Sequence, residues 1–345
     1  MRFLNNKMCA SKARIDNKTV VITGASDGIG KETARDLYAR GGKIIMACRN
    51  MEKANQAMED IKNNPPSYIK VTKEEYIKNA GELAIYILDL TSIKSVIECA
   101  RNLLTNESTI DILINNAGVA TQKSNGKTED GIQITFQVNY LGHFILTLLL
   151  LSKMKSSSNC RIVNVSSIAH IFGSMHFDDI NLERTNSPLM SYAFKSYAQS
   201  KLANILFTKE LTRRLKEADI HEINVYCLHP GIIPTIMLEK STKDIFLSPI
   251  INFFLKLFYK NVEEGAQTTV YCSVAEETAN ETGLYYSNCD VATTYREANN
   301  NQHAKKLWNL SCRLLNLEPD DNFNTFLETV SRQMLLCAQQ TPNII

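Results

Sequence analysis

Short apolar segments alternate with longer helical patterns along most of the chain, and this alternation limits the possible folds more than any other feature. Six segments rich in Val, Ile and Leu have the length of buried strands, and 283–286 is a seventh candidate; the six are 19–22, 43–47, 83–88, 110–114, 161–165 and 223–228. Helix candidates lie between them, at 29–40, 51–63, 92–104, 131–154 and 197–216. Such alternation is typical of parallel sheets with helices on both faces. The sequence therefore predicts an α/β fold with a doubly wound parallel sheet of about seven strands.

The composition is that of an ordinary folded protein. The 345 residues are 44% hydrophobic and 21% charged, and 38 Lys and Arg against 36 Asp and Glu leave a net charge of +2. This excludes a disordered or fibrous chain and gives no electrostatic basis for a nucleic-acid partner. The nine cysteines are odd in number and none are spaced as Cys-x-x-Cys, which argues against a disulfide framework and a metal site. A reducing compartment fits these cysteines best.

No stretch of the sequence predicts a transmembrane span. Residues 1–17 carry basic side chains but no apolar run, so they resemble neither a signal peptide nor a membrane helix. A mitochondrial transit peptide is the weaker alternative, because no clear amphipathic helix is present. The apolar stretches 144–151 and 245–259 are too short or too interrupted for a membrane helix, which needs about 18 residues. We expect a cytoplasmic protein and leave a peripheral membrane contact open.

A single domain accounts for most of the chain. We expect an N-terminal extension at 1–16, the α/β domain at 17–310 and a C-terminal tail at 311–345. Within the domain, 63–82 contains two prolines and several charged residues and is predicted to be an extended surface loop. The tail carries apolar residues at helical spacing, namely Phe323, Phe326, Val330 and Met334.

The first predicted strand runs directly into a glycine-rich turn and then into a helix. The turn is Thr23-Gly24-Ala25-Ser26-Asp27-Gly28-Ile29-Gly30. Gly24 permits a tight turn, while Gly28 and Gly30 allow backbone amides to approach a pyrophosphate. The helix that follows adds free N–H groups and the positive end of its dipole. In this strand–turn–helix context the glycines are a strong signal for dinucleotide binding.

The end of the second strand bears on which dinucleotide is bound. NAD sites usually place an acid there to bind the ribose 2′-hydroxyl. This chain has Ala47-Cys48-Arg49 instead, and a guanidinium can pair with a 2′-phosphate through two hydrogen bonds. Arg49 therefore favours NADP(H), and Ser26 could add a hydrogen bond. Asp27 complicates this prediction, because a carboxylate pointing inward would repel the phosphate.

The glycine spacing and the motifs that follow it resemble the short-chain dehydrogenase/reductase family. In chain order the motifs are Asp89-Leu90, Asn115-Asn116-Ala117-Gly118, Val138-Asn139, Ser166-Ser167, Tyr197-Ala198-Gln199-Ser200-Lys201 and 230–235. The resemblance covers roughly 17–310 and implies a Rossmann-type fold. It implies cofactor contacts at Gly24, Ser26, Asp27, Gly28, Ile29, Gly30, Asp89, Leu90, Asn116, Ala117, Gly118, Tyr197, Lys201, Pro230, Gly231, Ile233 and Thr235. Pro234 departs from the family pattern and removes one N–H donor.

The catalytic set is predicted from spacing and from the resemblance together. Tyr197 and Lys201 are four residues apart, so on a helix both side chains lie on one face. A nearby ammonium would lower the pKa of the tyrosine, which could then act as general acid and base. The resemblance implies that Ser167 binds the substrate oxygen and that Asn139 holds a water beside Lys201. No metal is expected.

Several phrases of the sequence are similar to the retinol dehydrogenases of the 11-to-14 type. They are 28–34, 47–49, 139–144 and 200–204. The resemblance implies NADP(H)-dependent interconversion of retinal or another lipophilic aldehyde or ketone with its alcohol. Two alternatives are a steroid or general carbonyl reductase and a catalytically silent NADP-binding interaction module. The resemblance also suggests a homodimer formed through the helices at 131–154 and 197–216.

Substrate specificity is expected in the segment 235–262, which is apolar but irregular. A lid over an apolar substrate would explain this composition, with Met237 and Leu238 contacting the substrate beside Ser167 and Tyr197. A peripheral membrane contact and ordinary core packing are the alternatives.

Overall fold

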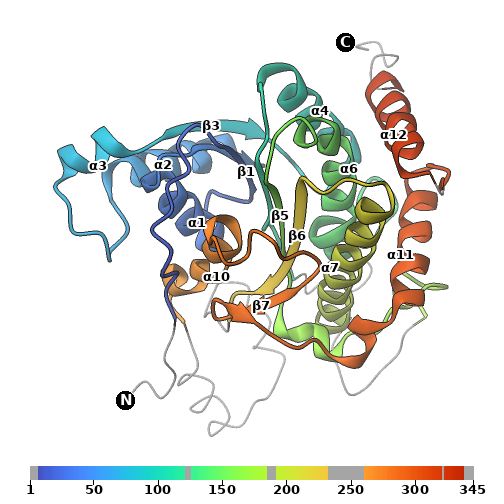
Figure 1. Cartoon of the computed structure of the whole chain (residues 1–345). Helices are drawn as coiled ribbons and strands as arrows, with labels where there is room; N and C mark the ends of the chain where they lie inside the picture. The colour runs from blue at the N-terminus through green and yellow to red at the C-terminus, as the bar shows by residue number, and fades with distance from the viewer. Residues whose placement is uncertain (1–6, 121–125, 185–191, 232–259, 321, 338–345) are drawn as a thin grey trace, which may run out of the picture.

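The computed structural model describes residues 7–120, 126–184, 192–231, 260–320 and 322–337. Within them, eight strands form one sheet in the order β3-β2-β1-β4-β5-β6-β7-β8 (Figure 1). The strands are β1 (Thr19–Thr23), β2 (Lys43–Cys48), β3 (Glu82–Ile87), β4 (Ile112–Asn115), β5 (Cys160–Val165), β6 (Ile223–His229), β7 (Tyr285–Ser287) and β8 (Asp290–Val291). Strands β1 to β7 pair in parallel, which confirms the predicted doubly wound sheet.

An eighth strand extends the predicted sheet of about seven. Strand β8 pairs antiparallel with β7 through a tight hairpin at Asn288 and Cys289. Both turn residues have positive φ, at 54° and 55°, as a two-residue hairpin of this twist requires. No sequence pattern predicts this strand, because it has only two residues and its turn contains no glycine.

Helices cover both faces of the sheet, as the alternation of side chains along each strand requires. Val20 and Ile22 point toward α1 (Gly28–Ala39), α2 (Met51–Asn63) and α10 (Val262–Val274). The two side chains and buried residues of these three helices form one apolar cluster. Val21, between them, belongs to the second cluster, with α4 (Ile93–Asn106), α6 (Gly142–Met154) and α7 (Tyr192–Glu217). Short helical turns occur at α5 (Ile134–Phe136), η2 (Ile168–Phe172) and η3 (Arg296–Asn299).

The segment 63–82 is not the extended loop that we expected throughout. Residues Lys73–Asn79 form helix α3, which is capped by the Thr72 side chain accepting from the Glu75 amide at 3.2 Å. Tyr76 anchors the helix, since its ring is buried and its hydroxyl donates to the Ile61 carbonyl at 2.9 Å. One buried aromatic and one cap suffice for this short helix, and neither produces the periodic pattern that predicts a longer one.

The longest apolar helix of the described chain lies inside the fold. Residues Ile134–Met154 form a continuous helix through α5, a π-helical turn η1 (Gln137–Leu141) and α6. By length and hydropathy this helix could cross a membrane, but 94% of its apolar window is buried within the protein. It therefore serves as a core helix between the sheet and the C-terminal helices (Figure 1).

Two C-terminal helices complete the core on this side. Helices α11 (Asn301–Leu314) and α12 (Phe323–Cys337) pack against α7 and α6, respectively (Figure 1). Trp308 is fully buried, with its ring 5.0 Å from Phe144 and 5.8 Å from Phe323 between centroids. The helical spacing predicted for the tail is confirmed.

Replacing Trp308 with alanine should lower the free energy of unfolding by about 3–5 kcal/mol, because it removes the largest fully buried side chain between four helices. Urea denaturation followed by circular dichroism measures this, since Trp308 is the single tryptophan of the chain. Lys305→Ala, at an exposed position of the same helix, is the control. A loss below about 1 kcal/mol would show that α11 contributes little to the core.

Candidate active site

The glycine turn places the start of α1 against the end of β4. A Cβ on Gly30 would lie 2.4 Å from the Gly24 carbonyl oxygen and 2.5 Å from the Asn116 amide nitrogen, so only glycine fits there. Gly24 has φ +69°, and a Cβ there would lie 3.0 Å from Ala117. Gly28 differs, because nothing lies within 4 Å of the position its Cβ would take. The turn is therefore closely packed at Gly24 and Gly30. Space is open beside Gly28, where the free amides of the helix could bind an anion.

Asp27 caps the first helix of the site. Its exposed carboxylate accepts from the Gly28 amide at 2.7 Å, and its backbone is extended, as N-cap geometry requires. The carboxylate is thus used at the helix N-terminus, where a negative charge is stabilised. The neighbouring Ser26 hydroxyl contacts the Cys48 thiol at the end of β2.

The Thr23 hydroxyl joins three segments of the site. It accepts from the backbone amides of Asn116 and Ala117, both at 3.0 Å, and lies 2.8 Å from His143 Nε2. His143 Nδ1 lies 3.2 Å from the Asn139 carbonyl oxygen. Because a carbonyl only accepts, Nδ1 carries the ring hydrogen and Nε2 accepts from Thr23. The strand end, the Asn116–Ala117 turn and the Asn139 helix are held together by this chain.

Asn139 lies in the π-helical turn η1, and both polar atoms of its side chain form hydrogen bonds. Its Oδ1 accepts from the Val119 amide at 2.7 Å, while its Nδ2 donates to the Val119 carbonyl at 3.0 Å and to the Ser200 hydroxyl at 2.9 Å. Such widened turns occur often at functional sites, since they shift one side chain out of helical register. Here the turn aims Asn139 at α7 and at the chain after β4.

Tyr197, Lys201 and Ser167 converge from α7 and from the end of β5. The Lys201 ammonium donates to the Val165 carbonyl at 2.9 Å and lies 5.6 Å from the centre of the Tyr197 ring. The Ser167 side chain lies close enough to the Tyr197 hydroxyl to lower the pKa of the tyrosine. A Cβ on Gly118 would lie 3.3 Å from the Lys201 ammonium and 3.4 Å from Asn139 Oδ1. Lys201 and Asn139 therefore meet beside Gly118, with Tyr197 next to Lys201 and Ser167 next to Tyr197.

Burial dominates the titration of this group in the ligand-free protein. It raises the pKa of Tyr197, and the hydrogen bond to Ser167 opposes this rise. It also lowers the pKa of Lys201 to about 8. The lowering of the tyrosine pKa by Lys201, which the sequence led us to expect, is not observed. The ammonium is engaged by the Val165 carbonyl, and its own charge is disfavoured by burial.

Comparisons with known proteins decide the family. A model of the family described as short chain dehydrogenase matches residues 18–178. Human retinol dehydrogenase 13 is 42% identical over 322 residues, covering 92% of this chain and 90% of that protein. Mouse retinol dehydrogenase 12 is 37% identical over 317 residues, covering 92% of both. The chain belongs to the short-chain dehydrogenase family. Its similarity to retinol dehydrogenases 11 to 14 confirms the predicted branch.

Solved structures support the same fold. An uncharacterized protein from Mycobacterium paratuberculosis superimposes with a TM-score of 0.68 at 30% identity, covering 90% of this chain and 98% of that one. L-sorbose reductase from Gluconobacter frateurii, complexed with NADPH and L-sorbose, does so with a TM-score of 0.58 at 21% identity, covering 79% and 95%. Proteins of the short-chain dehydrogenase family are oxidoreductases that use a nicotinamide dinucleotide, and this chain has the nucleotide-binding fold.

The remaining predicted cofactor residues of this short-chain dehydrogenase are spread along the carboxyl edge of the sheet. Asp89 Oδ1 accepts from the Thr91 amide at 2.9 Å and from the Thr91 hydroxyl at 2.7 Å. Neither of these two contacts involves the second carboxylate oxygen, Oδ2. Leu90 is buried against Gly142. Arg49 is exposed at the end of β2, and among the described residues no hydrogen bond or ion pair of its guanidinium is recorded.

The far end of the predicted cofactor site is only partly described. Pro230 and Gly231 follow β6, and the Gly231 amide donates to His229 Nδ1 at 3.1 Å. Gly231 has φ +96° and packs against the stem of Lys260. The predicted residues Ile233, Thr235, Met237 and Leu238 lie outside the described residues, as does 235–259 of the predicted lid.

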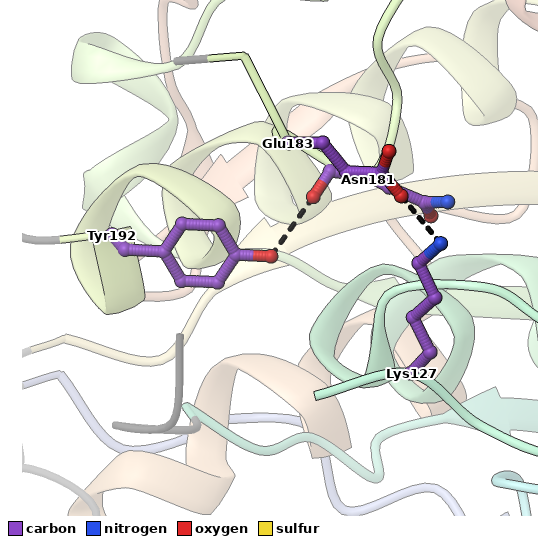
Figure 2. Close-up of a pocket in the computed structure, with 4 residues that line it drawn as sticks. All are labelled: Lys127, Asn181, Glu183 and Tyr192. Atoms are coloured by element: carbon purple, nitrogen blue, oxygen red, sulfur yellow. Dashed lines mark hydrogen bonds and ion pairs between the residues drawn. The ribbon is translucent and has the colours of Figure 1, made fainter. Parts of the chain in front are cut away.

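A polar pocket lies beside the start of α7 (Figure 2). Lys127, Asn181, Glu183 and Tyr192 line it around a cavity of about 270 Å³. The Tyr192 hydroxyl donates to the Asn181 carbonyl at 2.8 Å, and Lys127 forms an ion pair with Glu183 (Figure 2). No motif in the sequence predicts this pocket, because three of its residues come from loops and Tyr192 is the first residue of α7.

His143 was also missed, although a histidine in an otherwise apolar helix is a usable signal. Burial lowers its pKa to about 3, whereas a histidine in the unfolded chain titrates near 6.5. Between these values the unfolded chain binds a proton that the folded protein excludes. The contribution of His143 to stability is therefore present above pH 6.5 and is lost as the pH falls.

His143→Asn should remove this dependence. Between pH 6 and pH 4, the free energy of unfolding of the variant should fall less steeply than that of the wild type, by about 1.4 kcal/mol per pH unit. Urea titrations at pH 6, 5 and 4 measure both slopes. His221→Asn, at an exposed histidine, serves as the control. Parallel slopes for His143→Asn and the wild type would contradict the buried neutral imidazole.

Proposed function

We propose that this protein is an NADP(H)-dependent oxidoreductase that interconverts a lipophilic aldehyde or ketone with its alcohol, and that the substrate resembles retinal and retinol. The observation that carries the proposal is the grouping of Lys201 and Asn139 beside Gly118, with Tyr197 next to Lys201 and Ser167 next to Tyr197. The names of the similar proteins, retinol dehydrogenases 11 to 14, support the substrate class. A cytoplasmic location, a peripheral membrane contact and a homodimer remain proposals.

The residues present suit a nicotinamide dinucleotide. The open space before Gly28 and the free amides of α1 would hold the pyrophosphate, Asp89 Oδ2 could accept from the adenine amino group, and Lys201 would bind the ribose. Ser26, Asn116, Pro230 and Gly231 lie along the same edge. When bound, this cofactor supplies the hydride that is exchanged with the substrate carbon.

Tyr197 is suited to move the proton at the substrate oxygen. Its raised pKa keeps the phenol protonated at neutral pH, which is the form that donates to a carbonyl oxygen during reduction. Ser167 would bind the same oxygen and stabilise the charge that develops there. Asn139 fixes the chain around Val119 and Ser200, so that Lys201 and Tyr197 keep their places. A reduced NADPH pool would then favour reduction of the carbonyl, as the cofactor choice implies.

Tyr197→Phe tests the catalytic assignment. With NADPH and all-trans-retinal, the variant should lose about 10³-fold in kcat, because the proton donor is removed, while NADPH still binds. NADPH oxidation at 340 nm measures turnover, and cofactor fluorescence measures binding. Tyr295→Phe, which removes an exposed hydroxyl, is the matched control.

Three other outcomes of this assay are informative. If the wild type prefers steroids or small aldehydes over retinal, the general carbonyl reductase is favoured. If NADPH binds but no carbonyl is reduced, the catalytic proposal fails in favour of a binding module. If Tyr197→Phe retains the wild-type rate, Tyr197 is not the proton donor.

Arg49→Ala tests the choice of cofactor. The variant should bind NADPH at least tenfold more weakly, because a charge-assisted pair with the 2′-phosphate is lost, while NADH binding stays unchanged. Titration of cofactor fluorescence gives both dissociation constants. Arg296→Ala, at a basic position remote from β2, controls for the change in net charge. Equal weakening toward both dinucleotides would contradict a role in recognising the 2′-phosphate.

A further inference from the structure

A short turn after β5 carries a buried histidine that the proposed reaction does not use. Ser167 caps the 3₁₀ turn η2, and its Oγ accepts from the Ala169 amide at 3.2 Å. His170, three residues on, is only 2% exposed. Its backbone amide and its ring Nδ1 both point at the Ser167 carbonyl oxygen, at 3.1 and 2.8 Å. Two donors on one side of a peptide leave that peptide little freedom to rotate.

The tautomer of His170 follows from this contact. The Ser167 carbonyl can only accept, so Nδ1 carries the hydrogen, and the unprotonated Nε2 has no partner among the described residues. The ring packs edge-on against Tyr285, with centroids 5.2 Å apart, and Tyr285 also contacts His229. Burial lowers the pKa of His170 and so favours the neutral ring. None of these neighbours is an acid.

The same turn is locked to the helix that carries Tyr197. The Gly173 amide donates to the His170 carbonyl at 3.0 Å, and a Cβ on Gly173 would lie 2.6 Å from the Ala198 carbonyl oxygen. The backbone of η2 thus touches α7 one residue beyond Tyr197. The contact of Gly173 with Ala198 fixes η2 against α7, and the His170 ring fixes the Ser167 peptide at the start of η2. Together they set the position of Ser167 relative to Tyr197.

We propose that His170 is a positioning residue: its Nδ1–H holds the Ser167 peptide so that the Ser167 hydroxyl meets the hydroxyl of Tyr197. The inference rests on the proposed function of these two hydroxyls. His170 itself touches neither substrate nor cofactor in this role. Its effect passes through the Ser167 carbonyl at 2.8 Å, whereas the Tyr285 hydroxyl lies farther from Nδ1, at 3.4 Å.

Two substitutions separate the hydrogen bond from ring packing. Asparagine at 170 keeps a donor near the position of Nδ1 but loses the ring, whereas phenylalanine keeps a ring against Tyr285 but has no donor. We therefore expect His170→Asn to retain activity near that of the wild type and His170→Phe to lose about 100-fold in kcat, with the NADPH dissociation constant unchanged. A packing role predicts the reverse order, and that result would overturn the proposal.

A cycle with Ser167→Ala tests whether the effect passes through Ser167. If it does, His170→Phe should add little to the loss of activity already caused by Ser167→Ala. The pH profile of alcohol oxidation should also shift to higher pH, by the same amount in each single variant. Each variant removes the contact with Ser167 that opposes the raised pKa of Tyr197. Additive losses would contradict transmission through Ser167.

A third readout does not depend on turnover. In protein labelled with ¹³C at the tyrosine ζ carbon, the Tyr197 signal, assigned with Tyr197→Phe, should move in His170→Phe to its position in Ser167→Ala and stay unmoved in His170→Asn. If the wild type reduces no carbonyl, the proposed function fails, yet this spectrum still decides the role of His170. Should His170→Phe not fold, His170→Gln, whose amide reaches toward Nε2 rather than Nδ1, replaces it with the same expectation.

Discussion

The hydroxyl of Thr23 is the contact on which the rest of the site depends. It ends β1 at the point where the glycine turn begins, and it accepts from two successive amides of the turn after β4. Its own hydrogen goes to His143, whose ring donates onward to the Asn139 carbonyl. One small side chain thus sets the spacing between the nucleotide-binding turn and the helix that carries a proposed catalytic residue. Valine, which has the same shape, would remove the acceptor of the Ala117 amide and the donor to His143 Nε2, whereas the Asn116 amide would keep its hydrogen bond to the Ile114 carbonyl.

A second polar chain runs behind the site, through the core. Asn115 Nδ2 donates to Thr147 at 3.0 Å and to Asn164 Oδ1 at 2.8 Å, and Asn164 Nδ2 donates to Thr208 at 2.9 Å. These contacts join β4 to α6 and β5 to α7. Apolar packing tolerates small rotations of a helix, whereas buried hydrogen bonds do not. We infer that this chain fixes α7 in rotation, and with it the direction of Tyr197 and Lys201.

The features that the sequence predicted well are those with a local cause. The parallel strands follow from runs of β-branched residues, and the pairing of Tyr197 with Lys201 follows from helical periodicity. The features it missed arise from contacts between distant segments. The π-turn at Asn139, the tautomer of His170 and the pocket at Lys127 each depend on residues brought together only by the fold. Helix α3 and strand β8 were missed for another reason, since each is too short to produce a periodic pattern.

The position of Lys201 links its hydrogen bonding to its charge. Its ammonium carries three hydrogens, and the described structure supplies one carbonyl acceptor, from Val165. Burial without further acceptors disfavours the charge, which is why the pKa falls to about 8. The absence of a side chain at Gly118 leaves room beside the ammonium. An acceptor oxygen entering that space, such as a ribose hydroxyl, would favour the charged form again. The lysine and the phenol of Tyr197 would then interact through a full positive charge, which is the relationship that the spacing of the two residues predicts.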